Sequence, residues 1–313
     1  MIGLTGGNGF LGGRILQIAT TAKVKCYGRR QPKNLKGDHF YNGNINGNAN
    51  FSSFLNELDT VIHCAAHVMN DNSSILLEEF REVNTYGTLN LAKQAADAGV
   101  KRFIFISSIK VNGELTDVGI PFNAHDVCIP TDFYGLSKYE AEVGLRKIAN
   151  ETGMEVVIIR PPLVYGHGVK ANFSALLNLV TKKIPLPFGS IKNNQRSLVS
   201  VYNLVDLIDK CIYHPNAANQ TFLVSDDHDL STTEMVKLMA KVQGVKPWLI
   251  PVPVWMLKFL GKITGKSDMI SRLTDSLQVD ITHTRETLDW TPPYSVEDGF
   301  AMCVQKPIEI TRK

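Results

Sequence analysis

MIGLTGGNGFLG occupies residues 1–12, where a short apolar run passes directly into three evenly spaced glycines, Gly6, Gly9 and Gly12. A helical pattern follows over residues 14–19. Glycine permits positive φ and lets the backbone approach a pyrophosphate, and the free N–H groups at the start of the next helix bind the anion. A strand, a glycine turn and a helix in this order are typical of a dinucleotide-binding unit. A purely structural glycine turn is the alternative.

The first half of the chain alternates β-rich runs with helical patterns. A long helical pattern precedes Gly99, which we predict to be its C-cap. Strands that alternate with helices predict an α/β fold with a doubly wound parallel sheet of the Rossmann type. The predicted strands are residues 1–4, 23–27, 39–41, 60–64, 102–107 and 155–160, and the long helix is 75–98.

Prolines punctuate the chain from Pro161 onward, which predicts a second, smaller lobe of mixed structure. We predict a dinucleotide-binding domain over residues 1–160, with 196–225 returning to it. Residues 161–195 and 226–313 would form a substrate lobe. Its predicted helices are 232–242, 254–263 and 296–304, and the strand-like runs 198–201 and 220–224 are expected to join the main sheet.

Composition excludes several classes of protein. The 33 basic and 30 acidic residues are spread along all 313 positions, so no basic patch for nucleic acid is evident. The longest apolar run, residues 250–257, is eight residues with two prolines, whereas a membrane span needs roughly 20. Five scattered cysteines without a CxxC pair, and no signal-peptide pattern, predict a soluble cytoplasmic protein with reduced thiols and no metal site.

The end of the second predicted strand bears on the choice of dinucleotide. The strand runs into Gly28, Arg29 and Arg30, with no acidic residue to accept the ribose hydroxyls of NAD. Arginines pair instead with the 2′-phosphate of NADP, so NADP is the preferred cofactor. NAD stays open, because the two arginines are also consistent with a solvated loop or with stacking on adenine.

Three polar residues have the spacing of a proton-transfer site. Ser108 follows the predicted strand 102–107, while Tyr134 and Lys138 are four residues apart and share one helix face. A tyrosine with a pKa near 10 is a poor base at neutral pH. A neighbouring ammonium and an oxidised nicotinamide favour the phenolate, and a serine hydroxyl hydrogen-bonds the substrate oxygen while hydride moves.

The chain resembles the extended short-chain dehydrogenases/reductases that act on nucleotide sugars. The resemblance covers nearly the whole chain and includes a branch with UDP-4-keto-6-deoxy-N-acetylhexosamine reductases and UDP-sugar 4-epimerases. Order and spacing together make the match specific. The matching motifs are TGGNGFLG, VIHCAA, VNTYGTLNL, FISSIKVNG, YGLSK, IIRPPLVYG and TLDWTPPYSVEDGF.

The resemblance implies roles for individual residues. Ser108, Tyr134 and Lys138 would be the catalytic triad. The substrate would contact Ser108, Lys110, Asn172 and Arg196; a helix N-cap and a surface charge are the alternatives for the last two. An arginine suits a diphosphate because its planar fork bonds two oxygens at once. The cofactor-binding residues would be Gly6, Gly9, Phe10, Leu11, Gly12, Arg29, Arg30, Asn44, Ile45, Ala65, Ala66, Asn84, Tyr134, Lys138, Pro161 and Leu163.

Two positions depart from the family pattern. Asn112 stands where the family often has tyrosine, so we expect the loss of an aromatic wall near the sugar. Asn44 replaces an aspartate that commonly contacts adenine, and its amide can still donate and accept there.

These observations favour a reductase of a UDP-linked 4-keto sugar that uses NADP and serves polysaccharide or O-antigen precursor synthesis. The alternative is a UDP-hexose or UDP-N-acetylhexosamine 4-epimerase with tightly bound NAD, and a non-catalytic scaffold is a remote third. A homodimer is expected from the family. The apolar segment 254–263, with Lys258 and Lys262, fits a membrane surface, but we expect a core helix of the substrate lobe.

Overall fold

The protein is described from a computed structural model that covers residues 1–18, 23–33, 35, 39–68, 76–126, 128–169, 172–182 and 184–304. Seven parallel strands form the main sheet, in the order β10-β6-β5-β4-β1-β2-β3. The doubly wound α/β prediction is confirmed. The strands are β1 (Ile2–Thr5), β2 (Val24–Gly28), β3 (Phe40–Asn42), β4 (Thr60–His63), β5 (Arg102–Ile106), β6 (Glu155–Arg160) and β10 (Thr221–Leu223).

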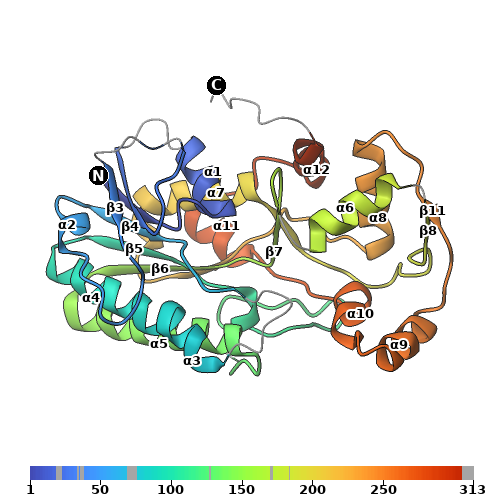
Figure 1. The fold of residues 1–313 in the computed structure, drawn as a ribbon, viewed down its shortest axis with the longest axis horizontal. Coiled ribbons are helices and arrows are strands. Elements are labelled where there is room, and N and C mark those ends of the chain that lie inside the picture. Colours follow the sequence, from blue (N-terminus) through green and yellow to red (C-terminus); the bar gives the residue numbers. More distant parts are fainter. Residues whose placement is uncertain are drawn as a thin grey trace.

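Helices cover both faces of this sheet (Figure 1). One apolar core joins the sheet to α1, α7 and α11, and a second joins it to α2, α4 and α5. Parallel strands buried on both faces are continuously apolar, as the buried β5 sequence RFIFI shows. The helices are α1 (Phe10–Ile18), α2 (Ser52–Leu55), α4 (Thr88–Asp97), α5 (Phe133–Thr152), α7 (Val201–Tyr213) and α11 (Thr282–Leu288).

The long helix predicted before Gly99 contains a widened turn. Helix α3 (Leu77–Phe80) continues into a π-helical stretch, η2 (Arg81–Gly87), and then into α4. Such stretches are rare and occur frequently at functional sites. The helical prediction for this part of the chain is confirmed over Leu77–Asp97, and the π-helical stretch is a feature that apolar spacing does not reveal.

The smaller lobe has a third apolar core. Predicted helices 232–242, 254–263 and 296–304 are confirmed as α8, α9 and α12. Strand β9 (Leu198–Ser200) was expected in the main sheet but pairs with β7 (Leu163–Tyr165), because Ser200 caps α7 and turns the chain there. The remaining elements are α6 (Asn172–Thr181), β8 (Pro185–Leu186), α8 (Thr232–Val242), β11 (Trp248–Leu249), α9 (Val254–Ile263), α10 (Ser267–Thr274) and α12 (Val296–Val304).

Helix α9 is not the core helix that its sequence led us to expect. It buries Leu257 and Gly261, while Trp255, Phe259 and Ile263 are exposed. Within the described residues, no helix has both the length and the apolar character needed to cross a bilayer.

Candidate functional site

The glycine turn between β1 and α1 needs its glycines for steric reasons. Gly6 has φ +76°, and a Cβ atom there would lie 2.7 Å from the Ala65 nitrogen. A Cβ on Gly12 would collide with the Gly6 carbonyl oxygen, which already accepts a hydrogen bond of 2.8 Å from the Gly9 nitrogen. The turn is therefore folded so tightly on itself and against the residues after β4 that Gly6 and Gly12 have no room for a side chain.

The segment after β4 is held beside this turn. The Ala65 nitrogen donates to Thr5 Oγ1 at 3.3 Å, and Ala66 is half-buried next to it. Asn84, buried in the π-helical stretch, accepts from the His67 nitrogen at 2.7 Å and donates to the His67 carbonyl at 2.9 Å. The π-helical turn thus aims one amide at both backbone groups of a residue in this segment.

Beyond β2 the chain presents the two arginines at the surface. Arg29 and Arg30 are exposed, and among the described residues neither side chain has a salt-bridge partner. Asn42 donates to the Arg29 carbonyl at 3.1 Å and Asn8 donates to that of Arg30. The backbone here is fixed while both guanidinium groups stay available. Asn44 is also exposed.

The predicted triad lies where β5 ends and α5 begins. Ser108 is half-buried and caps the short helix η3 (Ile109–Val111) by accepting from the Lys110 nitrogen at 3.3 Å. The η3 helix packs against α5, which carries Tyr134 and Lys138. Lys138 is buried and its Nζ donates to the Ile106 carbonyl at 2.9 Å, one strand residue before the serines. The structure therefore brings these three residues to one edge of the sheet.

Charges in this site are strongly perturbed by burial. Burial, together with the Asp132 carboxylate, raises the pKa of Tyr134 to about 12. Burial lowers the pKa of Lys138 to about 8, and burial beside Lys138 lowers the pKa of His63 to about 3. His63 is therefore neutral at physiological pH and lies between the Thr5 and Thr88 hydroxyls, at 2.7 and 2.9 Å. It is a structural histidine.

A buried ion pair supports the triad, and our reading of the sequence missed it. Glu142 accepts from Arg160 Nε at 2.9 Å and Nη2 at 2.6 Å, and from Ser107 Oγ at 2.6 Å. Tyr134, Lys138 and Glu142 are spaced by four, so one helix face holds all three. That spacing was the available signal.

Asn112 belongs to this buried network. Arg160 Nη1 donates to Asn112 Oδ1 at 3.0 Å, and Asn112 Nδ2 donates to the Asn123 carbonyl at 2.8 Å. The position therefore ties the ion pair to the loop before α5. We expected Asn112 to matter through a lost aromatic wall. Its side chain is instead buried and hydrogen-bonded inside the protein, because the guanidinium of Arg160 needs an acceptor there.

Lys110 was predicted to contact substrate, and the structure gives its ammonium partners within the protein. Its Nζ lies 3.0 Å from an Asp132 carboxylate oxygen and 3.3 Å from Glu114. Asp132 also caps α5 by accepting from the Gly135 nitrogen at 3.1 Å. Lys110 thereby joins η3 to the start of the helix that carries Tyr134.

The other predicted positions occupy the edges of the site. The Pro161 carbonyl accepts from the Ile109 nitrogen at 3.0 Å, and Leu163, at the start of β7, is exposed. Phe10, Leu11 and Ile45 are half-buried, and the side chain of Asn172 lies outside the described part of the chain. Among the described residues, no group of histidine, cysteine and carboxylate side chains has the arrangement of a metal site.

In the smaller lobe Arg196 is accompanied by a second arginine that the sequence analysis did not select. Arg196 Nη1 donates to the Asp275 carbonyl at 2.9 Å. Burial lowers the pKa of Arg196, and the charge of Arg272 contributes to this shift. The Asp275 carboxylate acts on the pKa of Arg196 in the opposite direction and more strongly than Arg272 does, so it offsets part of the positive charge gathered here.

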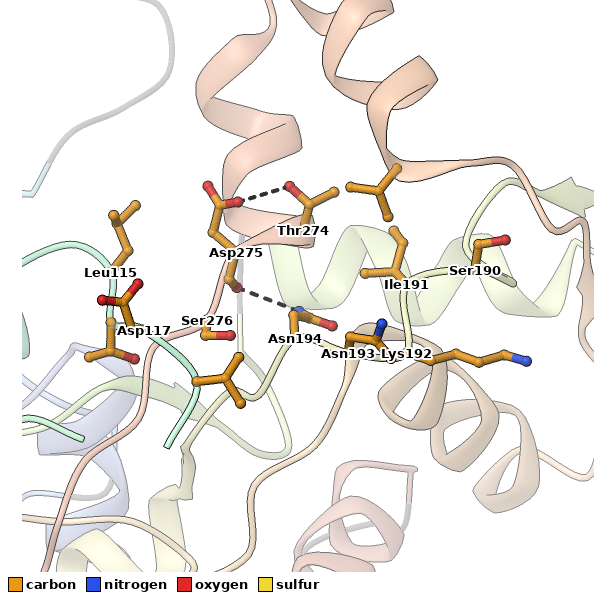
Figure 2. A pocket seen from close by; sticks show the side chains of 13 residues that line it. Leu115, Asp117, Ser190, Ile191, Lys192, Asn193, Asn194, Thr274, Asp275 and Ser276 are labelled. Atoms are coloured by element: carbon orange, nitrogen blue, oxygen red, sulfur yellow. Dashed lines mark hydrogen bonds between the residues drawn. The ribbon is translucent and has the colours of Figure 1, made fainter. Parts of the chain in front are cut away.

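A cavity of about 460 Å³ is lined in part by Asp275 (Figure 2). Its wall brings together four segments that are distant in sequence: residues 115–118, residues 190–194, the start of α9 at Val254, and residues 274–276 at the end of α10. Asn194 Nδ2 reaches the Asp275 carbonyl at 3.5 Å, so Asp275 borders both the cavity and Arg196.

The chain matches known proteins over most of its length. Residues 2–225 match the model of the NAD dependent epimerase/dehydratase family. The chain is 55% identical over 307 residues to a UDP-glucose 4-epimerase of Vibrio cholerae, covering 96% of this chain and 94% of that protein. It is 28% identical to the N-acetyl-alpha-D-glucosaminyl-diphospho-ditrans,octacis-undecaprenol 4-epimerase of Escherichia coli O157:H7, covering 96% and 93%.

A solved structure shows the same fold. The UDP-glucuronic acid 4-epimerase of Bacillus cereus, crystallised in complex with NAD, superposes with a TM-score of 0.76 at 18% identity, covering 96% of both chains. The family description and this structure name NAD, and neither supports the preference for NADP that Arg29 and Arg30 led us to expect.

Proposed function

The chain belongs to the NAD-dependent epimerase/dehydratase family, as an enzyme of the extended short-chain dehydrogenase/reductase type, and from this premise we propose that it is a UDP-sugar 4-epimerase. The observation that carries the proposal is the 55% identity to a UDP-glucose 4-epimerase over nearly the full length of both chains. The alternative considered from sequence thus replaces the 4-keto-sugar reductase that we favoured there.

The residues of the glycine turn fit a dinucleotide. The positive φ of Gly6 and the close packing at Gly6 and Gly12 leave the backbone of the turn free of side chains at the point where β1 enters α1, so a pyrophosphate can approach it closely. NAD held there would supply a hydride acceptor and donor for carbon 4 and a positive charge that favours the phenolate of Tyr134. Ala65, Ala66 and Asn44 would border it, and Asn84 would hold the Ala65–His67 segment in place.

The residues of the triad divide the proton chemistry. Tyr134, whose pKa is about 12 here, takes the proton from the hydroxyl at carbon 4 when positive charge lowers that pKa, and returns it later. Ser108 Oγ hydrogen-bonds the same oxygen. Lys138 supplies positive charge, and the hydrogen bond from its Nζ to the Ile106 carbonyl fixes the position of its ammonium group. Because the same groups serve both directions, no external reductant is consumed.

The smaller lobe would hold the nucleotide. We assign Arg196 and Arg272 to the diphosphate, because their positive charges interact and a guanidinium group bonds two phosphate oxygens at once. The single Asp275 carboxylate offsets only part of this positive charge. The division of the chain at residue 160 is part of this proposal, with the sugar lying between the lobes.

We further propose a cytoplasmic homodimer. The five cysteines are free thiols, in keeping with a reducing compartment. Tyr86 in η2 and Val143 on α5 are exposed apolar side chains on neighbouring helices of one face, a surface that fits a second copy. Analytical ultracentrifugation of a Val143→Glu variant tests this contact, since the change should shift the protein towards monomer.

The experiment that tests the function is conversion of UDP-glucose to UDP-galactose by the purified protein without added cofactor. We expect turnover, release of near-stoichiometric NAD on denaturation, and loss of turnover by at least about 100-fold in Tyr134→Phe. Tyr139→Phe on the same helix is the matched control and should be active. If the protein instead consumes NADPH with a 4-keto sugar nucleotide, and does not convert UDP-glucose without NADPH, the 4-keto-sugar reductase becomes the better assignment.

A further inference from the structure

Helix α9 carries an exposed apolar stripe at the far end of the smaller lobe, opposite the end where β1 to β5 lie (Figure 1). Trp255, Phe259 and Ile263 are 71%, 58% and 66% exposed. They are spaced by four residues, so they form one line along the helix. Monomeric proteins seldom leave three such side chains in a continuous line on the surface without a partner.

The opposite side of the helix is already used for packing. Leu257 is buried, and a Cβ on Gly261 would lie 2.8 Å from Ile270 of α10, so the two helices touch closely there. The stripe therefore faces away from the lobe, and α9 cannot turn it inward without losing this contact.

Apolar exposure is concentrated in this part of the described chain. Seven of the 20 exposed large apolar side chains fall within residues 248–269, including two of the three tryptophans in the whole sequence. Tryptophan is enriched where proteins meet the interface between lipid and water. The seven are Trp248, Ile250, Trp255, Phe259, Leu260, Ile263 and Met269.

The charge around the stripe has one sign. Residues 246–272 contain five basic residues and one acidic residue, in a chain whose net charge is only +3. Lys258 and Lys262 lie next to the stripe on the helix surface. Lys258 pairs with Asp275 at 2.8 Å, whereas Lys262 and Lys266 have no carboxylate partner within the described residues. An apolar line flanked by unpaired lysines complements an anionic lipid surface.

We propose that α9 docks the enzyme on the surface of an anionic membrane. A helix of 10 residues is about 15 Å long, half the thickness of a bilayer core, so it lies in the plane of the interface and does not span it. Trp255, Phe259 and Ile263 enter the acyl boundary, and Lys262 and Lys266 meet the headgroups. The inference rests on α9 and does not depend on which sugar the enzyme converts.

The test is flotation of the full-length protein with lipid vesicles. Vesicles of phosphatidylcholine alone are compared with vesicles in which roughly one third of the lipid is phosphatidylglycerol, at low and high salt. We expect binding to the anionic vesicles that weakens in salt. Trp255→Ser/Phe259→Ser should reduce partitioning at least about tenfold. Lys262→Glu/Lys266→Glu should reduce it at least about 25-fold, since the loss of each lysine costs about fivefold and the added carboxylates repel the anionic surface.

Two control variants show whether losing any exposed aromatic side chain, or any exposed lysine, weakens vesicle binding. Tyr213→Ser removes an exposed aromatic at the end of α7, and Lys93→Glu reverses an exposed lysine on α4. Both should bind vesicles as the wild type does, and all variants should retain epimerase turnover on soluble UDP-sugar. Absence of wild-type binding, or equal loss in the controls, overturns the proposal. The proposal is also overturned if light scattering shows an assembly larger than a dimer that only the Trp255→Ser/Phe259→Ser variant fails to form. In that case a second copy of the chain covers the stripe.

Discussion

Replacing Lys138 with methionine should make the cofactor-free protein more stable at pH 7 while abolishing its activity. Lys138 is 1% exposed, and its ammonium donates to the Ile106 carbonyl and lies 4.5 Å from the centre of the Phe105 ring. The described residues place no carboxylate at ion-pair distance from it. Burial accordingly lowers its pKa from 10.5 to about 8, although Cys64 and Glu142 act in the opposite direction.

The size of the effect follows from this shift. A displacement from 10.5 to about 8 corresponds to about 3 kcal/mol of destabilisation by the charged form at pH 7. Methionine has a similar volume and no charge. It leaves the Ile106 carbonyl without its donor, which costs about 1 kcal/mol. The expected net gain in the free energy of unfolding is about 2 kcal/mol.

The pH dependence fixes the sign of the argument. Because the folded pKa lies below the unfolded one, the ammonium destabilises the fold fully below pH 8. The destabilisation fades between pH 8 and 10.5, where the folded protein has lost the proton and the unfolded chain still holds it. As the pH rises, the free energy of unfolding of the wild type should therefore increase relative to that of Lys138→Met.

Urea unfolding of both proteins at pH 7 and near pH 10, after removal of bound nucleotide, measures this difference. Comparing the two proteins cancels the titration of cysteines and tyrosines that they share. If Lys138→Met were less stable at pH 7, or if the gap between the proteins stayed constant with pH, the buried charge would not be the cause.

Glu142→Gln should lower the free energy of unfolding, measured by urea denaturation, by about 3–5 kcal/mol, because it leaves the buried Arg160 guanidinium without its carboxylate. The double variant Glu142→Gln/Arg160→Met should recover part of this loss. Gly6→Ala should reduce the NAD retained through purification by at least about tenfold, because alanine at φ +76° is strained by about 1–2 kcal/mol and its methyl group would collide with the Ala65 nitrogen and distort the turn. Equal retention, measured by chromatography of the released nucleotide, contradicts the assignment. Tyr165→Phe should cost about 1–3 kcal/mol in thermal unfolding without changing KM, because the Asp226 carboxylate loses a donor 2.7 Å away.

The fold was predictable because its signals are local. The glycine turn, the apolar strand runs and the helix that starts before Tyr134 each follow from residues close together in sequence. All six strands predicted in the first half appear, within a residue or two of their bounds. Strand β9 could not be placed correctly, since pairing with β7 rather than with the main sheet depends on where Ser200 turns the chain.

The site was predictable only in part, for a related reason. Ser108, Tyr134 and Lys138 have a recognisable spacing, so sequence sufficed to select them. Arg160 and Asn112 act through contacts made across 48 positions, and no local pattern marks them. The preference for NADP over NAD found no support, because Arg29 and Arg30 show only which charges are available at the end of β2 and do not determine which cofactor binds.

The π-helical stretch Arg81–Gly87 has a consequence for how this part of the chain tolerates length changes. A π turn holds one residue more than an α turn, so deleting a single residue from it would leave an ordinary α-helix whose two flanks, α3 and α4, keep their phase. Phe80 would then keep its edge contacts with His67 and Tyr134. Deleting Asn84 itself would remove the amide that binds both backbone groups of His67. The helix would therefore tolerate the loss of one residue here, whereas the segment after β4 would lose the side chain that holds it.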